Sequence, residues 1–162
     1  MARLFNRNFI VGVTGSIAAY KAAELTRSLI REGASVRVIM TEGACEFITP
    51  LTLQALSGHE VHTDLLDTEA EAAMGHIELA RWADAFLIAP ASADSIARLV
   101  QGRADDLLGA CALATPAPVF VAPAMNQEMW AKQATQDNVQ TLVSRGIAML
   151  GPSSGSQACG DV

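Results

Sequence analysis

The sequence predicts one α/β domain, a doubly wound parallel sheet with helices on both faces in a Rossmann-like or flavodoxin-like layout. Short apolar runs rich in β-branched residues alternate along the chain with segments of helical periodicity. Of the 162 residues, 51% are apolar and 17% are charged, which suits a compact core. Neither a repeat nor an interdomain linker interrupts the pattern, so residues 1–162 are expected to form a single domain.

Each element follows from its local pattern. Apolar runs predict buried parallel strands at Phe9–Thr14, Ala85–Ala89 and Pro118–Ala122. Alternation predicts another strand at Ser35–Met40, and helical periodicity predicts a helix at Ile17–Glu32. Weaker signals predict a short helix and the segment Pro50–Leu56, brief strands at Glu60–His62 and Ile147–Leu150, and helices at His76–Trp82, Ala93–Gln101, Asp105–Leu113 and Asn138–Arg145.

Charge and hydropathy exclude several classes of protein. The formal net charge is −6 and Lys and Arg form no cluster, which argues against nucleic acid as a partner. The apolar runs are shorter than the roughly 18 residues of a membrane span, and residues 1–8 lack a secretory apolar region. We therefore expect a cytoplasmic protein with no membrane partner.

The cysteines and histidines predict no metal site. Three widely spaced cysteines without a CxxC motif fit free thiols in a reducing cytoplasm. Cys45 and Cys111 lie in apolar helical contexts and are predicted to be core residues. His59 and His62 lack further ligand residues nearby and are interpreted as surface residues beside a strand.

Ligands of such a sheet bind beyond the carboxyl ends of its strands, and the first unusual turn there is Gly12–Ile17. Gly15 allows close backbone approach, and Ser16 can cap the helix or reach an anion. Helix N-terminal amides favour phosphate, and the absence of GxGxxG favours a single phosphate over a pyrophosphate. An ordinary capped helix explains the same residues.

Two further turns follow other strands. Thr41–Gly43 begins with a hydroxyl that can support a phosphate or simply cap the next helix. Pro90–Ser95 combines small residues, against which a planar ring can pack, with polar side chains that can bind ring or ribityl oxygens. A helix N-terminus with several possible caps is the alternative for this turn.

The fourth turn, Pro123–Trp130, has the most unusual composition. Met and Trp supply flat apolar surface, while Asn126 offers one acceptor and two donors. This suits a flat aromatic ligand beside a polar group. Met125, Met129 and Trp130 are also explained as core residues at helical spacing. Together the four turns outline a phosphate cradle and a flat pocket.

Six segments match a known family, and PAMNQEMW and the ACGD ending are the specific ones. On these segments, from Phe9 to Asp161, the chain resembles the homo-oligomeric flavin-containing cysteine decarboxylases. The likeness is greatest to the phosphopantothenoylcysteine decarboxylase domain of the bacterial bifunctional coenzyme A biosynthesis protein. The segments are Gly12–Lys21 (GVTGSIAAYK), Gly75–Asp84 (GHIELARWAD), Ile88–Asp94 (IAPASAD), Ala104–Leu108 (ADDLL), Pro123–Trp130 (PAMNQEMW) and Gly155–Asp161 (GSQACGD).

The resemblance implies FMN-dependent decarboxylation of 4′-phosphopantothenoyl-cysteine to 4′-phosphopantetheine in coenzyme A biosynthesis. A carboxylate on an unactivated carbon has nowhere to leave its electrons. Hydride removal by FMN from the thiol-bearing carbon gives a thioaldehyde, and the carboxylate is then β to an electron sink. After carbon dioxide leaves, the enethiolate is reduced and protonated, so the flavin cycles without net redox change.

Residue roles follow from the resemblance alone. His76 matches the catalytic histidine, a base or a group that orients the substrate carboxylate, although a capping histidine explains the sequence equally. Asn126 would bind the substrate carboxylate or amide. Cys159 would protonate the enethiolate from a mobile segment, 151–162, that covers the substrate; a stray thiol in a tail is the alternative.

The resemblance also assigns the cofactor contacts. Asp94 stands where family members often have Asn, which places a carboxylate beside the flavin. The residues at the FMN phosphate would be Gly15, Ser16 and Ile17, with Thr41, Glu42 and Gly43, and those bordering the flavin would be Ser92, Ala93, Asp94, Ser95 and Ala124.

Family members form trimers, often assembled into dodecamers, with FMN near a subunit interface, so we expect a homotrimer or a multiple of it. They usually continue after ACGD with a Gly-rich segment containing Arg, and bifunctional proteins then continue into a synthetase domain, whereas this sequence stops at Val162. We therefore expect the loss of that segment to affect activity more than FMN binding.

Three other functions are alternatives to this one. A flavin enzyme acting on another cysteine-containing substrate, such as a peptide C-terminus, would need a peptide-binding insertion that is not evident. A non-enzymatic phosphatase regulator of the same fold would lack the catalytic Cys or His, whereas His76 and Cys159 are both present. A flavin prenyltransferase would need no ACGD segment.

Overall fold

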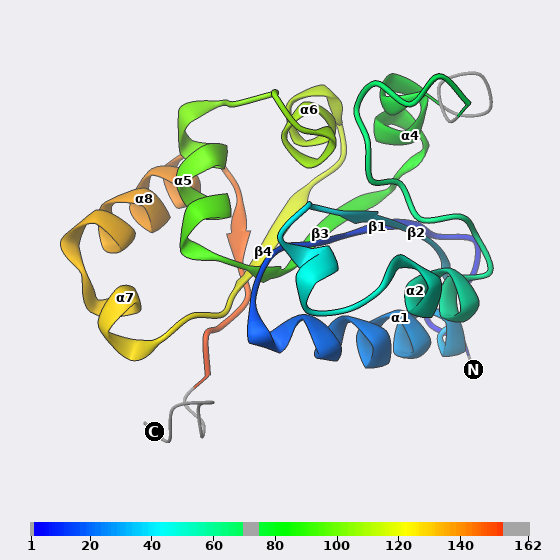
Figure 1. Ribbon diagram of the computed structural model, residues 1–162, viewed down its shortest axis with the longest axis horizontal. Helices are drawn as coiled ribbons and strands as arrows, with labels where there is room; N and C mark the ends of the chain where they lie inside the picture. Colours follow the sequence, from blue (N-terminus) through cyan, green and yellow to red (C-terminus); the bar gives the residue numbers. More distant parts are fainter. Residues whose placement is uncertain (1, 70–74, 154–162) are drawn as a thin grey trace.

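The computed structural model describes residues 2–69 and 75–153, which form a five-stranded parallel sheet flanked by helices (Figure 1). The strand order is β2-β1-β3-β4-β5, and every adjacent pair is parallel. This is the flavodoxin-like order, whose topological switch point lies between β1 and β3. The predicted doubly wound class is confirmed. The strands are β1 (Asn8–Val13), β2 (Ser35–Met40), β3 (Ala85–Ala91), β4 (Val119–Pro123) and β5 (Ala148–Met149).

The strands are apolar on both sides because helices cover both faces. Ile10 and Val11, neighbours on β1, are both fully buried but belong to different hydrophobic clusters. The cluster of Ile10 contains residues of α4, α5, α6 and α8, and that of Val11 contains residues of α1 and α2. The helical segments are η1 (Ile17–Tyr20), α1 (Lys21–Arg31), η2 (Ala44–Glu46), α2 (Pro50–Ser57), α4 (His76–Trp82), α5 (Ala93–Gln101), α6 (Leu107–Ala114), α7 (Gln127–Ala131) and α8 (Gln133–Ser144).

Most predicted elements are present, and the errors lie at their ends. The helix predicted at Ile17–Glu32 begins as a 3-10 turn, because the Ser16 hydroxyl accepts from the Ala18 amide at 3.1 Å and closes a tight first turn. The turn predicted after β4 contains the helix α7, which Asn126 caps. The brief strand predicted at Glu60–His62 is a single bridge between His62 and Ile39.

The cysteine predictions are only partly right. Cys111 is fully buried, and burial raises the pKa of its thiol to about 12, so it stays protonated. Cys45 packs against the hydrophobic cluster that contains Val11 and residues of α1 and α2. It is only half-buried, because η2 lies near the surface. His59 and His62, expected at the surface, are half-buried as well. In the part of the chain that the structure describes, the helices are too short or too polar to cross a membrane.

Candidate functional site

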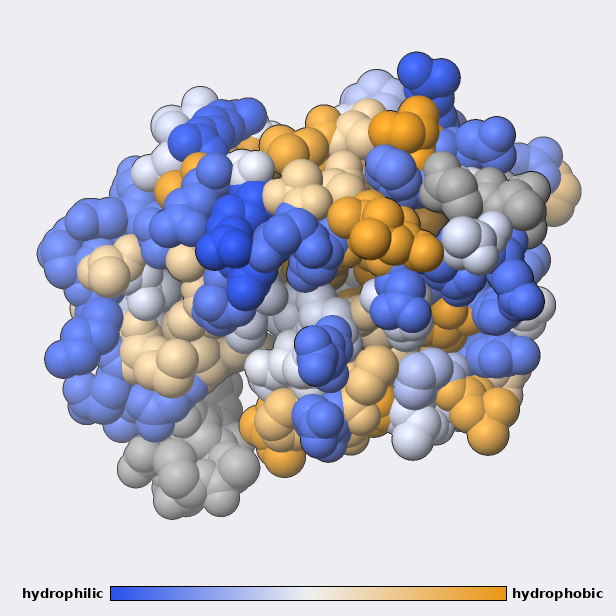
Figure 2. All heavy atoms as spheres, turned by 45° about the horizontal axis from the view of Figure 1, so that its top comes forward, coloured by the Kyte–Doolittle hydropathy of each residue, from blue (hydrophilic) through white to orange (hydrophobic). Residues whose placement is uncertain are grey.

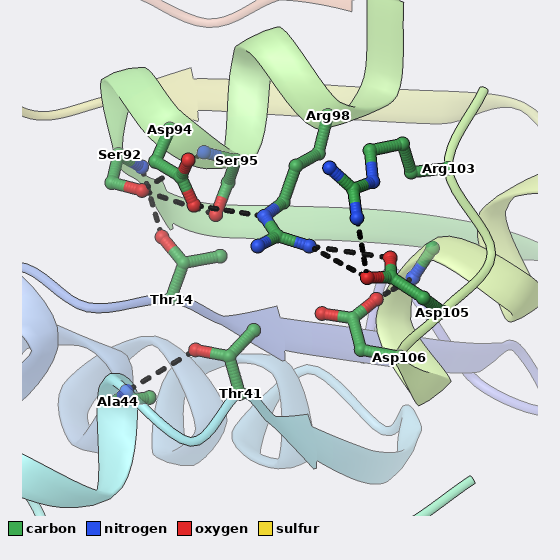
Figure 3. Close-up of polar contacts among 11 residues, drawn as sticks. Thr14, Thr41, Ala44, Ser92, Asp94, Ser95, Arg98, Arg103, Asp105 and Asp106 are labelled. Atoms are coloured by element: carbon green, nitrogen blue, oxygen red, sulfur yellow. Dashed lines mark hydrogen bonds and ion pairs between the residues drawn. The ribbon is translucent and has the colours of Figure 1, made fainter. Parts of the chain in front are cut away.

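Thr14 joins the carboxyl ends of β1 and β3 at the switch point (Figure 3). Its hydroxyl donates to the Pro90 carbonyl at 2.7 Å and accepts from the Ser92 amide at 2.8 Å. Its backbone amide donates to the same Pro90 carbonyl at 3.2 Å. The side chain is fully buried, so these contacts fix the β3 loop against β1. Thr14 was not among the predicted site residues, although a hydroxyl directly after a buried apolar run was a usable signal.

The two bonds of the Thr14 hydroxyl, to Pro90 and to Ser92, form a clamp between β1 and the β3 loop. Removal of this hydroxyl should lower the stability of the fold. Thr14→Val keeps the side-chain shape but leaves the Ser92 amide without its Thr14 acceptor, which should lower the free energy of unfolding by about 1–3 kcal/mol. Urea denaturation would measure the difference. Thr14→Ser keeps the hydroxyl and is the matched control, expected to lose less than the valine variant. A valine variant as stable as the wild type, or a serine variant that loses more stability than the valine variant, would contradict a stabilising role for the clamp.

The loops after β1 and β2 meet backbone to backbone. A Cβ atom on Gly15 would lie 3.2 Å from the carbonyl carbon of Gly43 and 3.3 Å from its Cα atom. The Thr41 amide also donates to the Val13 carbonyl at 3.0 Å. Two of the predicted phosphate loops, those of Gly15 and Gly43, are therefore adjacent, and the contact between them is made by backbone alone.

The hydroxyls of these loops cap helical turns. Ser16 accepts from the Ala18 amide at 3.1 Å, and Thr41 accepts from the Ala44 amide at 3.1 Å (Figure 3 shows the latter). A hydroxyl that accepts such a bond retains its own O–H donor. The capping and the anion-binding interpretations are therefore compatible, and the same side chains can do both.

The β3 loop begins α5 with a serine pair and a charged residue. Ser92 accepts from the Ser95 amide at 3.1 Å, and its hydroxyl donates to the Ser95 hydroxyl at 3.0 Å. Asp94, on the same first turn, accepts from Arg98 Nε at 2.9 Å. The serines thus fix the start of α5, while the Asp94 carboxylate is paired within its own helix.

The β4 loop continues the same edge of the sheet. The Ala124 amide donates to the Ala91 carbonyl at 3.1 Å, which joins this loop to the end of β3. Asn126 accepts from the Glu128 amide at 2.8 Å and caps α7. Met129 is 47% exposed and Trp130 is half-buried, so the interpretation of these two as core residues is wrong. They leave apolar surface beside Asn126.

His76 does not join these loops within one chain. It is the first residue of α4, which packs on α6, and the Cys111 thiol donates to its carbonyl at 3.6 Å. In Figure 1, α4 and α7 lie at opposite ends of the molecule. The structure therefore brings the four predicted turns to one edge of the sheet but separates His76 from Asn126. Cys159 lies outside the described residues.

Sequence comparisons place the chain among flavoproteins. The Flavoprotein family model matches residues 2–162. The chain is 59% identical over 160 residues to the Coenzyme A biosynthesis bifunctional protein CoaBC of Haemophilus influenzae, covering 99% of this chain and 40% of that protein. It is 58% identical over 159 residues to the protein of the same name from Escherichia coli K12, covering 98% and 39%. The chain thus spans about two-fifths of the length of these relatives.

Solved structures agree with the observed topology. The FMN-dependent cysteine decarboxylase SpaF matches with a TM-score of 0.85 and 34% identity, over 94% of this chain and 87% of that one. A Cys-to-Ser mutant of PPC decarboxylase complexed with pantothenoylaminoethenethiol matches with a TM-score of 0.80 and 32% identity, over 96% and 87%. These matches confirm the resemblance seen in the sequence motifs. The chain belongs to the Flavoprotein family.

Proposed function

We propose that this chain is an FMN-dependent decarboxylase that converts 4′-phosphopantothenoyl-cysteine to 4′-phosphopantetheine in coenzyme A biosynthesis. The observation that carries the proposal is the gathering of four loops of small and hydroxylated residues at the β1/β3 switch point, where a sheet of this order takes its ligand. The likeness to the coenzyme A biosynthesis proteins and to PPC decarboxylase supports the choice of substrate. Wide cysteine spacing without a CxxC motif supports a cytoplasmic location.

The loops fit FMN. The backbones of Gly15 and Gly43 are in direct contact, and neither glycine has a side chain that would obstruct a phosphate bound by the amides of these loops. Ser16, Ile17, Thr41 and Glu42 would complete the phosphate end. The small residues Ser92, Ala93, Ser95 and Ala124, with Asp94, would border the ring. When bound, FMN supplies hydride acceptance from the thiol-bearing carbon and returns the hydride after decarboxylation.

The remaining predicted residues would bind the substrate or transfer its protons. The bond from the Glu128 amide fixes the Asn126 side chain at the end of β4, where its amide would bind the substrate carboxylate or amide. His76 would orient the carboxylate or act as a base. Cys159 would donate the proton that completes the product, because an ordinary thiol is mostly protonated at neutral pH.

Product analysis tests this function directly. The FMN-loaded wild-type chain, given 4′-phosphopantothenoyl-cysteine without air, should release carbon dioxide and form 4′-phosphopantetheine. Cys159→Ser should release carbon dioxide but accumulate the oxidised, unsaturated thiol. Absence of carbon dioxide release from a flavin-loaded wild type would contradict the proposal. Release only from a peptide that ends in cysteine would also contradict the proposed substrate and would favour a peptidyl one.

We infer that the active form is a homotrimer or a dodecamer assembled from trimers. The helix α4, which begins at His76, and the helix α7, which Asn126 caps, lie at opposite ends of the molecule (Figure 1), so a second copy is needed to bring these two residues to the same substrate. Exposed apolar side chains are available near both, including Ile77 beside His76 and Met129 beside Asn126. Figure 2 shows that hydrophobic patches lie among hydrophilic residues on one face of the molecule, as a surface for further copies requires.

Mixed assemblies test this arrangement. His76→Ala and Asn126→Ala chains should each be inactive alone, but assemblies that contain both should regain activity, because one chain supplies His76 and the other Asn126. Two affinity tags would isolate the mixed assemblies after co-expression, and decarboxylation would be measured. Assemblies of two differently tagged His76→Ala chains are the control. Mixed assemblies as inactive as the control would contradict the shared site.

A further inference from the structure

We propose that Arg98 is a positioning residue that neutralises Asp94 at the rim of the flavin site and thereby keeps the reduction potential of bound FMN from falling. The inference rests on the proposed function, because it concerns the cofactor of that site. It assigns a role to a charged chain of four residues, Asp94, Arg98, Asp105 and Arg103, which joins the start of α5 to the loop before α6 (Figure 3).

The position of Asp94 follows from the clamp at the switch point. Thr14 holds the Ser92 amide, Ser92 caps α5, and Asp94 lies two residues later on the first turn of that helix. Its side chain is 78% exposed, so its charge faces the solvent side of the loop and not the core. A ligand at the carboxyl ends of β1 and β3 would therefore have this carboxylate as a neighbour.

Arg98 is held between two carboxylates. Its Nε donates to Asp94 at 2.9 Å, and its Nη1 donates to the two Asp105 oxygens at 3.2 and 3.4 Å. Arg103 also donates to Asp105, at 2.7 Å. Two cations thus alternate with two anions, and the guanidinium of Arg98 is anchored on the side away from Asp94. The hydrogen bond that Arg98 donates to Asp94 is the main reason that the pKa of Arg98 is raised, which keeps it cationic.

This arrangement matters for a cofactor that gains electrons. Reduction adds negative charge to a flavin, and a carboxylate beside it opposes that gain. The paired guanidinium offsets part of the opposing charge at short range. Arg98 acts through Asp94, because the bonds that it makes here go to carboxylates. Arg103 is the natural comparison, since it shares Asp105 with Arg98 but has no bond to Asp94.

The reduction potential of bound FMN, measured by redox titration of the FMN-loaded chain, tests the proposal. Arg98→Met should shift the potential to a more negative value, and Asp94→Asn should shift it to a less negative one. The double variant Asp94→Asn, Arg98→Met should return close to wild type, because no unpaired carboxylate remains at position 94. Arg103→Met should stay close to wild type.

The outcomes separate this inference from the function that it rests on. Equal shifts for Arg98→Met and Arg103→Met, or a double variant as negative as Arg98→Met, would overturn the role of Asp94 while leaving FMN binding intact. A wild-type chain that takes up no FMN would instead overturn the proposed function, and this inference with it. If Arg98→Met fails to fold, an unchanged potential in Asp94→Asn overturns the inference alone.

Discussion

Gly15→Ala should weaken the retention of FMN through purification while the chain still folds. The new Cβ atom would lie 3.2 Å from the carbonyl carbon and 3.3 Å from the Cα atom of Gly43, closer than ordinary van der Waals contact. The three atoms nearest to the new Cβ belong to the Gly43 backbone and not to a flexible side chain. The loops after β1 and β2 would therefore have to move apart by a few tenths of an ångström. Because both loops would hold the phosphate, the flavin should be bound less tightly. Absorbance of the purified protein and FMN titration of the apoprotein would measure the effect.

Gly43→Ala is the matched control for that experiment. Its Cβ atom would come no closer than 3.4 Å to Gly15, which is ordinary contact, and its φ of −62° suits alanine. We expect this variant to retain FMN better than Gly15→Ala, and circular dichroism should show both folded. Equal retention of FMN by the two variants would contradict the view that the close approach of these loops shapes the phosphate site.

His76→Ala should lower kcat by roughly 10²–10⁴-fold, the usual contribution of a positioned acid or base. FMN should still bind, because His76 begins α4, which lies at the opposite end of the molecule from α7. It is also separate from the loops after β1 and β3 that Thr14 joins. Decarboxylation rate and flavin absorbance, measured on the same preparation, separate these effects.

His59→Ala serves as the control for the loss of a histidine elsewhere on the chain. His59 is half-buried and lies three residues before His62, which bridges Ile39. It is not among the residues of the proposed site. Its replacement should leave kcat near wild type. A His76→Ala chain that keeps full activity would remove this residue from the catalytic account, and one that loses FMN would show a structural role instead.

The sequence predicted the sheet well because its physical signal is local. Buried parallel strands such as β1 and β3 are short apolar runs, and the bounds of Ser35–Met40, which alternation indicated, were predicted without error. The ends of the helices were harder to predict, because capping side chains determine where a helix begins. Ser16 and Asn126 have side chains that can either cap a helix or bind a ligand, and only the folded chain shows that both cap here.

The residues of the candidate site could be predicted from the sequence, but the contacts that bring them together could not. The glycines and hydroxyls that follow the strands pointed to its loops, since carboxyl ends of parallel strands share one edge. The contact of Gly15 with Gly43 and the clamp by Thr14 depend on neighbours about 30 and 80 residues away in the chain, which no local pattern encodes. A motif also cannot state which copy of a chain supplies His76, so its separation from Asn126 came only from the structure.

The measurement that tests the central claim most directly is an absorption spectrum of the purified wild-type chain, followed by acid release and identification of any bound ligand. We predict a flavin absorption band and released FMN in near-equal amount to the chain. A colourless protein that also fails to bind added FMN would contradict the flavin site at the β1/β3 switch point and the decarboxylase function built on it.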